Sequence, residues 1–362
     1  MESVHSALLT CPNITTLDLR VTGINRSTWP SRWNFPFNPA GGDTYPNLKV
    51  LRLEGYDLND KGEGESWRVN QCWTRDTSEC VRESIRERLN WYYNRDWMAW
   101  LTWRLLPKAQ REKSNGELWL DAMDWSQIEE LAIESPVSDA IKYSLGGSSS
   151  LRRLKTTDLD LVLALRNNTL NELSWVRQWN KNSDYNGLPE ILERQGRSLQ
   201  SLEFRCPESY CKSDFSAASH YLDLIPKHTH RLRHLSINIP RNGTWPLETL
   251  DMIANLPTLE IADIWMNIQS QCSDWLEYSG EPQHWIEELF GNCEGETQFQ
   301  MPFSNGTSEV ELFAYMKEKN QGRELREVTF RVGDFTRPCI SPRYRKKWLE
   351  GQGAKGKGCM QD

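Results

Sequence analysis

The sequence lacks the features by which most enzymes and membrane proteins are recognised. No stretch approaches the roughly 18 consecutive apolar residues that a membrane span needs. Met1 to Ala7 is too short and too polar for a signal peptide, so a secretory leader, if the protein uses one, is missing. No GxSxG, HExxH or other nucleophile-and-base pattern is present. We therefore expect no membrane span, no catalytic residues and no cofactor.

A surplus of positive charge is also missing. The formal net charge is −7 and the pI is about 5.6, which argues against a nucleic-acid partner, because phosphate contacts need clustered Lys and Arg. Acidic pairs such as Glu129 and Glu130 are interpreted as solvated helix or turn faces. With 38% hydrophobic and 26% charged residues, the 362-residue chain has a soluble composition and can bury a large core, as two domains or one repeat array.

Two patterns imitate ligand sites. The run GQGAKGKG, Gly351 to Gly358, matches GxGxxG and GxxxxGK, but it lies at the polar C-terminus and has Gly358 where a phosphate loop needs Ser or Thr. His228, His230 and His234 could be metal ligands, yet the sequence places no carboxylate to orient their rings. We therefore predict neither a nucleotide site nor a metal site.

Cysteines and glycosylation sequons bear on the cellular compartment. The nine cysteines contain no CxxC pair, which argues against structural zinc. Cys72 with Cys80 and Cys206 with Cys211 are close enough for local disulfides; in an oxidising compartment we expect Cys206 and Cys211, which bracket a short turn, to be bonded. Five Asn-x-Ser/Thr sequons exceed the roughly three expected by chance and make the chain a candidate glycoprotein: Asn13, Asn25, Asn167, Asn242 and Asn305. This excess favours secretion slightly, and a cytoplasmic location stays open.

An internal repeat organises most of the chain. The template apolar-x-x-apolar-x-apolar first occurs in CPNITTLDLR, before which no helix is expected. It occurs in nine segments in all, and two of them, those starting at Leu151 and Leu259, match with one weakened position. The segments are Ile14/Leu17/Leu19, Leu48/Leu51/Leu53, Ile128/Leu131/Ile133, Leu151/Leu154/Thr156, Leu170/Leu173/Trp175, Leu199/Leu202/Phe204, Leu232/Leu235/Ile237, Leu259/Ala262/Ile264 and Leu325/Val328/Phe330. This spacing is typical of leucine-rich repeats, in which each segment contributes one short parallel strand and a return segment.

The predicted fold is therefore an α/β leucine-rich-repeat solenoid with parallel strands on its concave face. Its subtype is irregular, because the Asn or Cys expected three residues after the third apolar position is absent nearly everywhere, Asn267 being the exception. We expect helical or irregular return segments.

Two long insertions interrupt the repeats. The predicted regions are N-terminal repeats (1–54), a Trp-rich helical insertion (55–127), regular repeats (128–268), a second insertion (269–324), a terminal repeat or cap (325–350) and a flexible tail (351–362). The Trp-rich segment SIRERLNWYYNRDWMAWLTWRLLPKAQREK has aromatic residues at near-helical spacing. We interpret it as a helix packed on the solenoid, with a lipid- or partner-binding helix as the alternative.

One row of side chains is a candidate binding surface. In a stacked parallel sheet, the residues after the third template position form a continuous row on the concave side. The row consists of Arg20, Glu54, Glu134, Thr157, Val176, Arg205, Asn238, Trp265 and Arg331. An ordinary solvated strand surface would explain its charges equally well. We place the centre of a contact at Arg205, Asn238 and an exposed Trp265, since Arg and Trp often dominate binding energy.

Several longer segments carry a resemblance to a known family. RWNFPFNPAGGDTYPNLKVLRLEGYD, ELWLDAMDWSQIEELAI, RQGRSLQSLEFR, RNGTWPLETL, ELREVTFRVGDFTRP and WLEGQGAK resemble a large family of leucine-rich-repeat proteins from filamentous fungi, over nearly the whole chain. Members of that family are similar to the repeat arms of F-box proteins. The resemblance implies a binding scaffold with no established activity and no catalytic residues. Cys339 stands where the family has an aromatic residue after TRP.

Two functions remain open at this stage. The first is a self-contained scaffold that binds a protein or a glycan through its strand face. The second is the substrate-receptor arm of an F-box-type ubiquitin ligase, for which a small helical F-box should precede the repeats. The identity of the partner and the oligomeric state stay undetermined.

Overall fold

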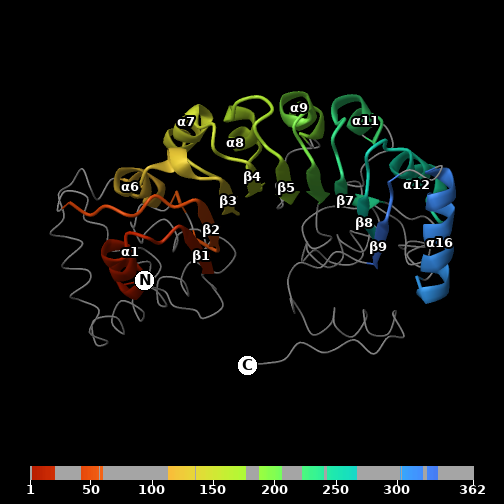
Figure 1. The fold of residues 1–362 in the computed structure, drawn as a ribbon, viewed down its shortest axis with the longest axis horizontal. Helices are drawn as coiled ribbons and strands as arrows, with labels where there is room; N and C mark the ends of the chain where they lie inside the picture. Colours follow the sequence, from red (N-terminus) through yellow and green to blue (C-terminus); the bar gives the residue numbers. More distant parts are fainter. Residues whose placement is uncertain are drawn as a thin grey trace, which may run out of the picture. The chain divides into compact units, whose positions relative to one another are not determined.

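Nine short strands alternate with helices along the described part of the chain, so the molecule has an α/β architecture (Figure 1). The computed structural model describes residues 2–20, 42–56, 58–59, 113–134, 136–176, 187–205, 222–239, 243–266, 302, 304–320 and 324–332. The chain divides into two compact units, Met1–Thr169 and Leu170–Asp362, which we call the N-terminal unit and the C-terminal unit. The division falls inside the predicted regular repeats, and each unit is described by itself.

The described residues of the N-terminal unit form four parallel strands in the order β1-β2-β3-β4. Its elements are α1 (Glu2–Thr10), β1 (Thr16–Arg20), β2 (Val50–Glu54), α6 (Asn115–Ala122), the 3-10 helix η4 (Trp125–Gln127), β3 (Glu130–Ile133), α7 (Asp139–Gly147), β4 (Arg153–Thr156) and α8 (Leu159–Ala164). In Figure 1, α7 and α8 lie on one side of β3 and β4. The opposite side of these strands carries their alternate, more exposed residues.

The C-terminal unit contains five parallel strands in the order β5-β6-β7-β8-β9. Its elements are β5 (Glu172–Val176), α9 (Leu188–Gln195), β6 (Ser201–Arg205), α11 (Leu224–His228), β7 (His234–Ile239), α12 (Leu247–Ala254), β8 (Ile261–Met266), α16 (Gly306–Lys319) and β9 (Glu327–Val332). Helices α9, α11 and α12 lie on one side of the strands (Figure 1). Across the described ranges of both units, none of the helices has the length and apolar character needed to cross a membrane.

Each of the nine apolar templates falls on one strand, and equivalent positions pair in register. Leu51 lies between Leu17 and Leu131 in the N-terminal unit, and Leu202 pairs with Leu235 in the C-terminal unit. Leu51, Leu131 and Leu202 are completely buried, because alternate strand residues point toward the helices. The prediction of an α/β fold with parallel strands is confirmed.

A shared carbonyl joins neighbouring strands. The carbonyl oxygen of Lys49 accepts hydrogen bonds from the consecutive N–H groups of Glu129 and Glu130, at 2.8 and 3.0 Å. The same arrangement recurs at the residue after the first template position. The acceptors are Thr15, Lys49 and Glu129 in the N-terminal unit and Asn171, Gln200, Arg233 and Glu260 in the C-terminal unit. The template therefore repeats in hydrogen bonding as well as in sequence.

Hydroxyl groups link some of the segments in the absence of a regular asparagine ladder. The Ser198 hydroxyl donates to the carbonyl of Leu170 at 2.6 Å, and the Thr258 hydroxyl donates to the carbonyl of Leu232 at 2.8 Å. Both hydroxyl residues directly precede the first apolar position of their template, and both acceptors are the first apolar position of the preceding one. These bonds satisfy buried carbonyl groups between segments.

Two tryptophans of the predicted Trp-rich insertion belong to the core. Trp119 and Trp125 are 0% and 1% exposed. The Trp119 indole N–H donates to the Tyr56 hydroxyl at 3.4 Å. Its ring makes an edge contact with the Tyr45 ring, with 5.3 Å between the two ring centroids. These two side chains therefore pack inside the N-terminal unit. The stretch of that segment from Ser84 to Glu112 lies outside the described residues.

The expectation that no helix precedes the first repeat is wrong. Helix α1 directly precedes β1, and it is anchored by contacts distant in sequence. Leu8 is buried, and His5 Nδ1 forms a 2.6 Å hydrogen bond with the Tyr45 hydroxyl. Burial, with a smaller contribution from the charge of Asp43, raises the pKa of the Tyr45 phenol, which keeps this hydroxyl protonated.

Candidate functional site

Side chains that alternate with the buried template positions form three rows on each unit, and together they make up its strand face. The first row precedes the second template position, the middle row lies between the second and third positions, and the last row follows the third. The N-terminal rows are Thr16, Val50, Glu130 and Arg153, then Asp18, Arg52, Ala132 and Lys155, then Arg20, Glu54, Glu134 and Thr157. The C-terminal rows are Glu172, Ser201, His234, Ile261 and Glu327, then Ser174, Glu203, Ser236, Asp263 and Thr329, then Val176, Arg205, Asn238, Trp265 and Arg331.

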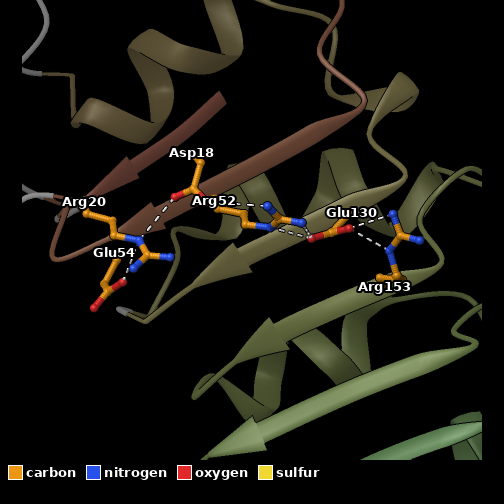
Figure 2. A network of polar contacts seen from close by, with 6 residues as sticks. All are labelled: Asp18, Arg20, Arg52, Glu54, Glu130 and Arg153. Atoms are coloured by element: carbon orange, nitrogen blue, oxygen red, sulfur yellow. Dashed lines mark hydrogen bonds and ion pairs between the residues drawn. The ribbon is translucent and has the colours of Figure 1, made fainter. Parts of the chain in front are cut away.

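The strand face of the N-terminal unit carries a continuous ion-pair network (Figure 2). Glu130 of β3 is only 14% exposed and lies between two arginines. Arg52 contacts it at 2.5 to 2.6 Å, and Arg153 contacts its other oxygen at 2.6 Å. The hydrogen bond from Arg52 to Glu130 is the main reason that the pKa of this guanidinium is raised. The interpretation of Glu130 as a solvated residue is therefore wrong, because two neighbouring strands hold its carboxylate.

The same network continues to the last row of this unit. Asp18 lies 3.4 Å from Arg52 and 3.5 Å from Arg20, and Arg20 also contacts Glu54 at 3.5 Å. Arg20 and Glu54 were predicted as binding residues, and the register places them opposite each other on β1 and β2. Glu134 follows β3 and is half-buried, with its backbone carbonyl accepting the Thr157 hydroxyl at 2.6 Å. Figure 2 shows positive and negative groups alternating across the strands, so their charges largely neutralise one another.

The last row of the C-terminal unit has a different arrangement, centred on Trp265. The guanidinium carbon of Arg205 lies 4.1 Å from the centroid of the Trp265 ring, and that of Arg331 lies 4.9 Å from it. The two arginines come from β6 and β9, on opposite sides of β8 in the strand order. The indole N–H donates to the Ser236 hydroxyl at 3.2 Å. Cation–π contacts and one hydrogen bond therefore fix the position of this ring.

The members of this row differ in accessibility. Asn238 is 1% exposed and pairs in register with Trp265, which pairs with Arg331. The Arg205 side chain is 9% exposed and donates to Glu203 at 2.7 Å. Trp265 is half-buried, so the expectation of an exposed tryptophan is wrong, because two guanidinium groups cover it. The structure thus brings Arg205, Trp265 and Arg331 together, and of these Arg331 is the exposed one.

A Ser-His-Asp arrangement lies in the first and middle rows of the same unit. His234 contacts the Ser201 hydroxyl through Nδ1 at 3.2 Å and Asp263 through Nε2 at 2.8 Å. Asp263 therefore orients the ring of His234, which sequence reasoning missed. The backbone N–H groups of Ser201, His234 and Ile261 all donate to carbonyls of the preceding strand. The arrangement adds side-chain hydrogen bonds between β6, β7 and β8 to those of the backbone.

The other predicted sites are only partly covered by the described residues. Asn13, Asn167 and Asn305 are exposed, and Asn305 also caps α16 by accepting from two backbone N–H groups. Asn25, Asn242 and the predicted disulfide between Cys206 and Cys211 lie outside those residues, as does the GQGAKGKG run. Cys11, the one described cysteine, is free and exposed. No group of three or more His, Cys, Asp or Glu side chains in the described ranges could hold a metal ion.

Comparison with known proteins adds no relative to this description. No protein-family model matches the chain, and no curated protein matches it.

Proposed function

We propose that this protein is a non-catalytic binding scaffold, built as a leucine-rich-repeat solenoid, that holds a protein partner on its strand face. Nine apolar templates, one strand in each and a recurring shared carbonyl support the repeat architecture. Such segments bury their apolar side only by stacking on neighbours, which leaves the alternate side chains as continuous rows. The rows are spaced for recognition of an extended surface, with neighbouring strands about 4.8 Å apart.

The single observation that carries this proposal is the Trp265 ring held by two arginines in the last row. Tryptophan and arginine are the side chains that most often dominate the energy of protein interfaces. Because Ser236, Arg205 and Arg331 already fix the ring, little side-chain entropy remains to be lost when a partner binds. The last row of the strand face therefore offers a preorganised contact.

The test is selection of binders from a random peptide display library against the full-length protein. Binders that contact the last row should lose affinity when Trp265→Ala is introduced, by about 2 kcal/mol, or about 30-fold. Circular dichroism and thermal melting establish that the variant is folded. Arg331→Ala provides a second variant at an exposed position, where loss of the side chain leaves the core intact.

Tyr143→Ala is the matched control for removal of a large aromatic side chain. Tyr143 is 88% exposed on α7, away from the strand face, so this change should leave the selected binders unaffected. The proposal is rejected if folded Trp265→Ala captures every selected binder as well as the parent does. It is also rejected if no peptide binds the folded parent protein.

A further inference from the structure

The three rows of the C-terminal strand face separate positive from negative charge. Its four carboxylates all stand in the first and middle rows: Glu172, Glu203, Asp263 and Glu327. The last row contains Arg205 and Arg331 and has no carboxylate. The face therefore has a positive edge at the carboxyl ends of its strands, although the chain as a whole is acidic, with a net charge of −7.

Three of these six charged groups already have a polar partner. Glu203 is paired with Arg205 and accepts the Ser174 hydroxyl, and Asp263 is paired with His234. Arg331 is exposed, and its contact in the structure is with the Trp265 ring. Among the described residues, no carboxylate lies within ion-pair distance of Arg331. This guanidinium is therefore available to a negatively charged group from another molecule.

The contact with Trp265 orients the guanidinium of Arg331 for binding a negatively charged group. A guanidinium held against an aromatic ring keeps its N–H donors at the edge of the group, where they can pair with both oxygens of a carboxylate. Apolar side chains beside that carboxylate would meet the exposed part of the indole. A nucleic acid is disfavoured, because its successive phosphates would extend over the four carboxylates in the adjoining rows, whereas a single carboxylate needs only Arg331.

We infer that the partner presents an acidic protein segment to the last row, with a Glu or Asp carboxylate on Arg331 and an apolar neighbour against Trp265. This inference rests on the proposed function and specifies its ligand. Charge complementarity favours an acidic ligand, because the last row carries two arginines and no carboxylate. The nearest carboxylates of the middle row, Glu203 and Asp263, are already paired. The acidic side chain supplies the ion-pair partner that Arg331 lacks within the described chain.

The test uses fluorescein-labelled short peptides built from Gly, Leu and Glu, with counterparts in which Gln or Lys replaces Glu. Fluorescence anisotropy with the full-length protein should show the Glu peptide binding about tenfold more tightly than the Gln peptide. Arg331→Gln should abolish this preference, and Arg331→Lys should retain part of it. High salt should weaken the Glu peptide more than the Gln peptide.

Lys155→Gln is the matched control for removal of one exposed cation. Lys155 stands in the middle row of the N-terminal unit, and this change should leave the preference for Glu unchanged. An equal loss in Lys155→Gln and Arg331→Gln would show general charge attraction and would overturn the inference, as would equal binding of the Glu and Gln peptides. A further outcome is that the library selection yields binders that depend on Trp265 while the short peptides show no preference for Glu over Gln. That result would contradict the acidic ligand and would still support the proposed function.

Discussion

The strand faces of the two units arrange their charges in different ways. In the N-terminal unit four cations and four carboxylates are mixed across the rows, and six of these groups join one network (Figure 2). In the C-terminal unit the carboxylates occupy two rows and the arginines the third. Mixed charges satisfy one another and leave little attraction for other molecules, whereas separated charges keep part of theirs. If the C-terminal strand face binds a partner, as we propose, similar strand faces serve stability in one region and recognition in another.

The energetic roles of the two regions follow from burial. Arg52 and Arg153 are 43% and 47% exposed, so each of their pairs with Glu130 contributes little by itself and is weakened by salt. Arg205 is 9% exposed, and its removal would leave Glu203 without its cation. We therefore expect one buried pair in the C-terminal unit to matter more than one exposed pair in the N-terminal unit.

The largest loss of stability is expected for Arg205→Ala. The change removes the contact with Trp265 and leaves Glu203 unpaired, so the free energy of unfolding should fall by about 2 kcal/mol. Thermal melting and hydrogen exchange of the amides in β6 to β8 measure the loss. Arg331→Ala, at an exposed position, should cost less than about 0.5 kcal/mol. Equal losses from the two changes would mean that Arg205 is not a structural residue.

A smaller effect is expected for Glu130→Ala in the N-terminal unit. The change leaves Arg153 without its carboxylate and leaves Arg52 with Asp18 alone, at a cost of about 1 kcal/mol after allowance for solvent screening. The cost should shrink in about 1 M salt, where the screening length is about 3 Å. Glu54→Ala is the control, because Glu54 is 58% exposed and contacts one arginine. Hydrogen exchange in β2 to β4 reports the effect, and a loss independent of salt would contradict the network.

The smallest expected effect concerns acid stability. The hydrogen bond from Lys49, at 2.8 Å, lowers the pKa of Glu129 below its ordinary value of 4.5. A carboxyl group with a lowered folded-state pKa stabilises the protein above its unfolded-state pKa, and this contribution is lost as the pH falls through the folded-state value. Glu129→Gln should therefore flatten the decline of the denaturation midpoint below about pH 4.5. An unchanged acid limb in this variant would exclude the contribution of Glu129.

The sequence predicted the strands because three apolar positions at fixed spacing specify both a strand and its buried side. The template therefore found β1 as readily as β7, and it placed Trp265 next to Arg331 in one row. It missed α1, whose anchor joins His5 to Tyr45 across 40 residues. Contacts between residues so far apart in sequence form only when the chain has folded, and a local sequence pattern cannot predict them.

The candidate site was predicted in part for a related reason. The prediction covered only the last row, and it named the arginines and Trp265. It did not include the first two rows, where Asp263 orients His234 and Glu130 joins two arginines. Alternation along each strand could have identified these outward positions. Their pairing could not be predicted, because it depends on side chains 23 to 78 residues apart that meet across neighbouring strands.

The shared carbonyl between strands has a consequence for chain entropy. Glu130 of β3 meets Arg52 across 78 residues and Arg153 across 23 residues, yet the same backbone junction forms on both sides of β3. Closure of a segment becomes less favourable only with the logarithm of its length, so the longer connection costs about 1 kcal/mol more than the shorter one. Register is set by the neighbouring strand and depends little on the length of the connection. Segments between strands can therefore lengthen over evolutionary time at a small cost in free energy, without displacing the rows that the strands carry.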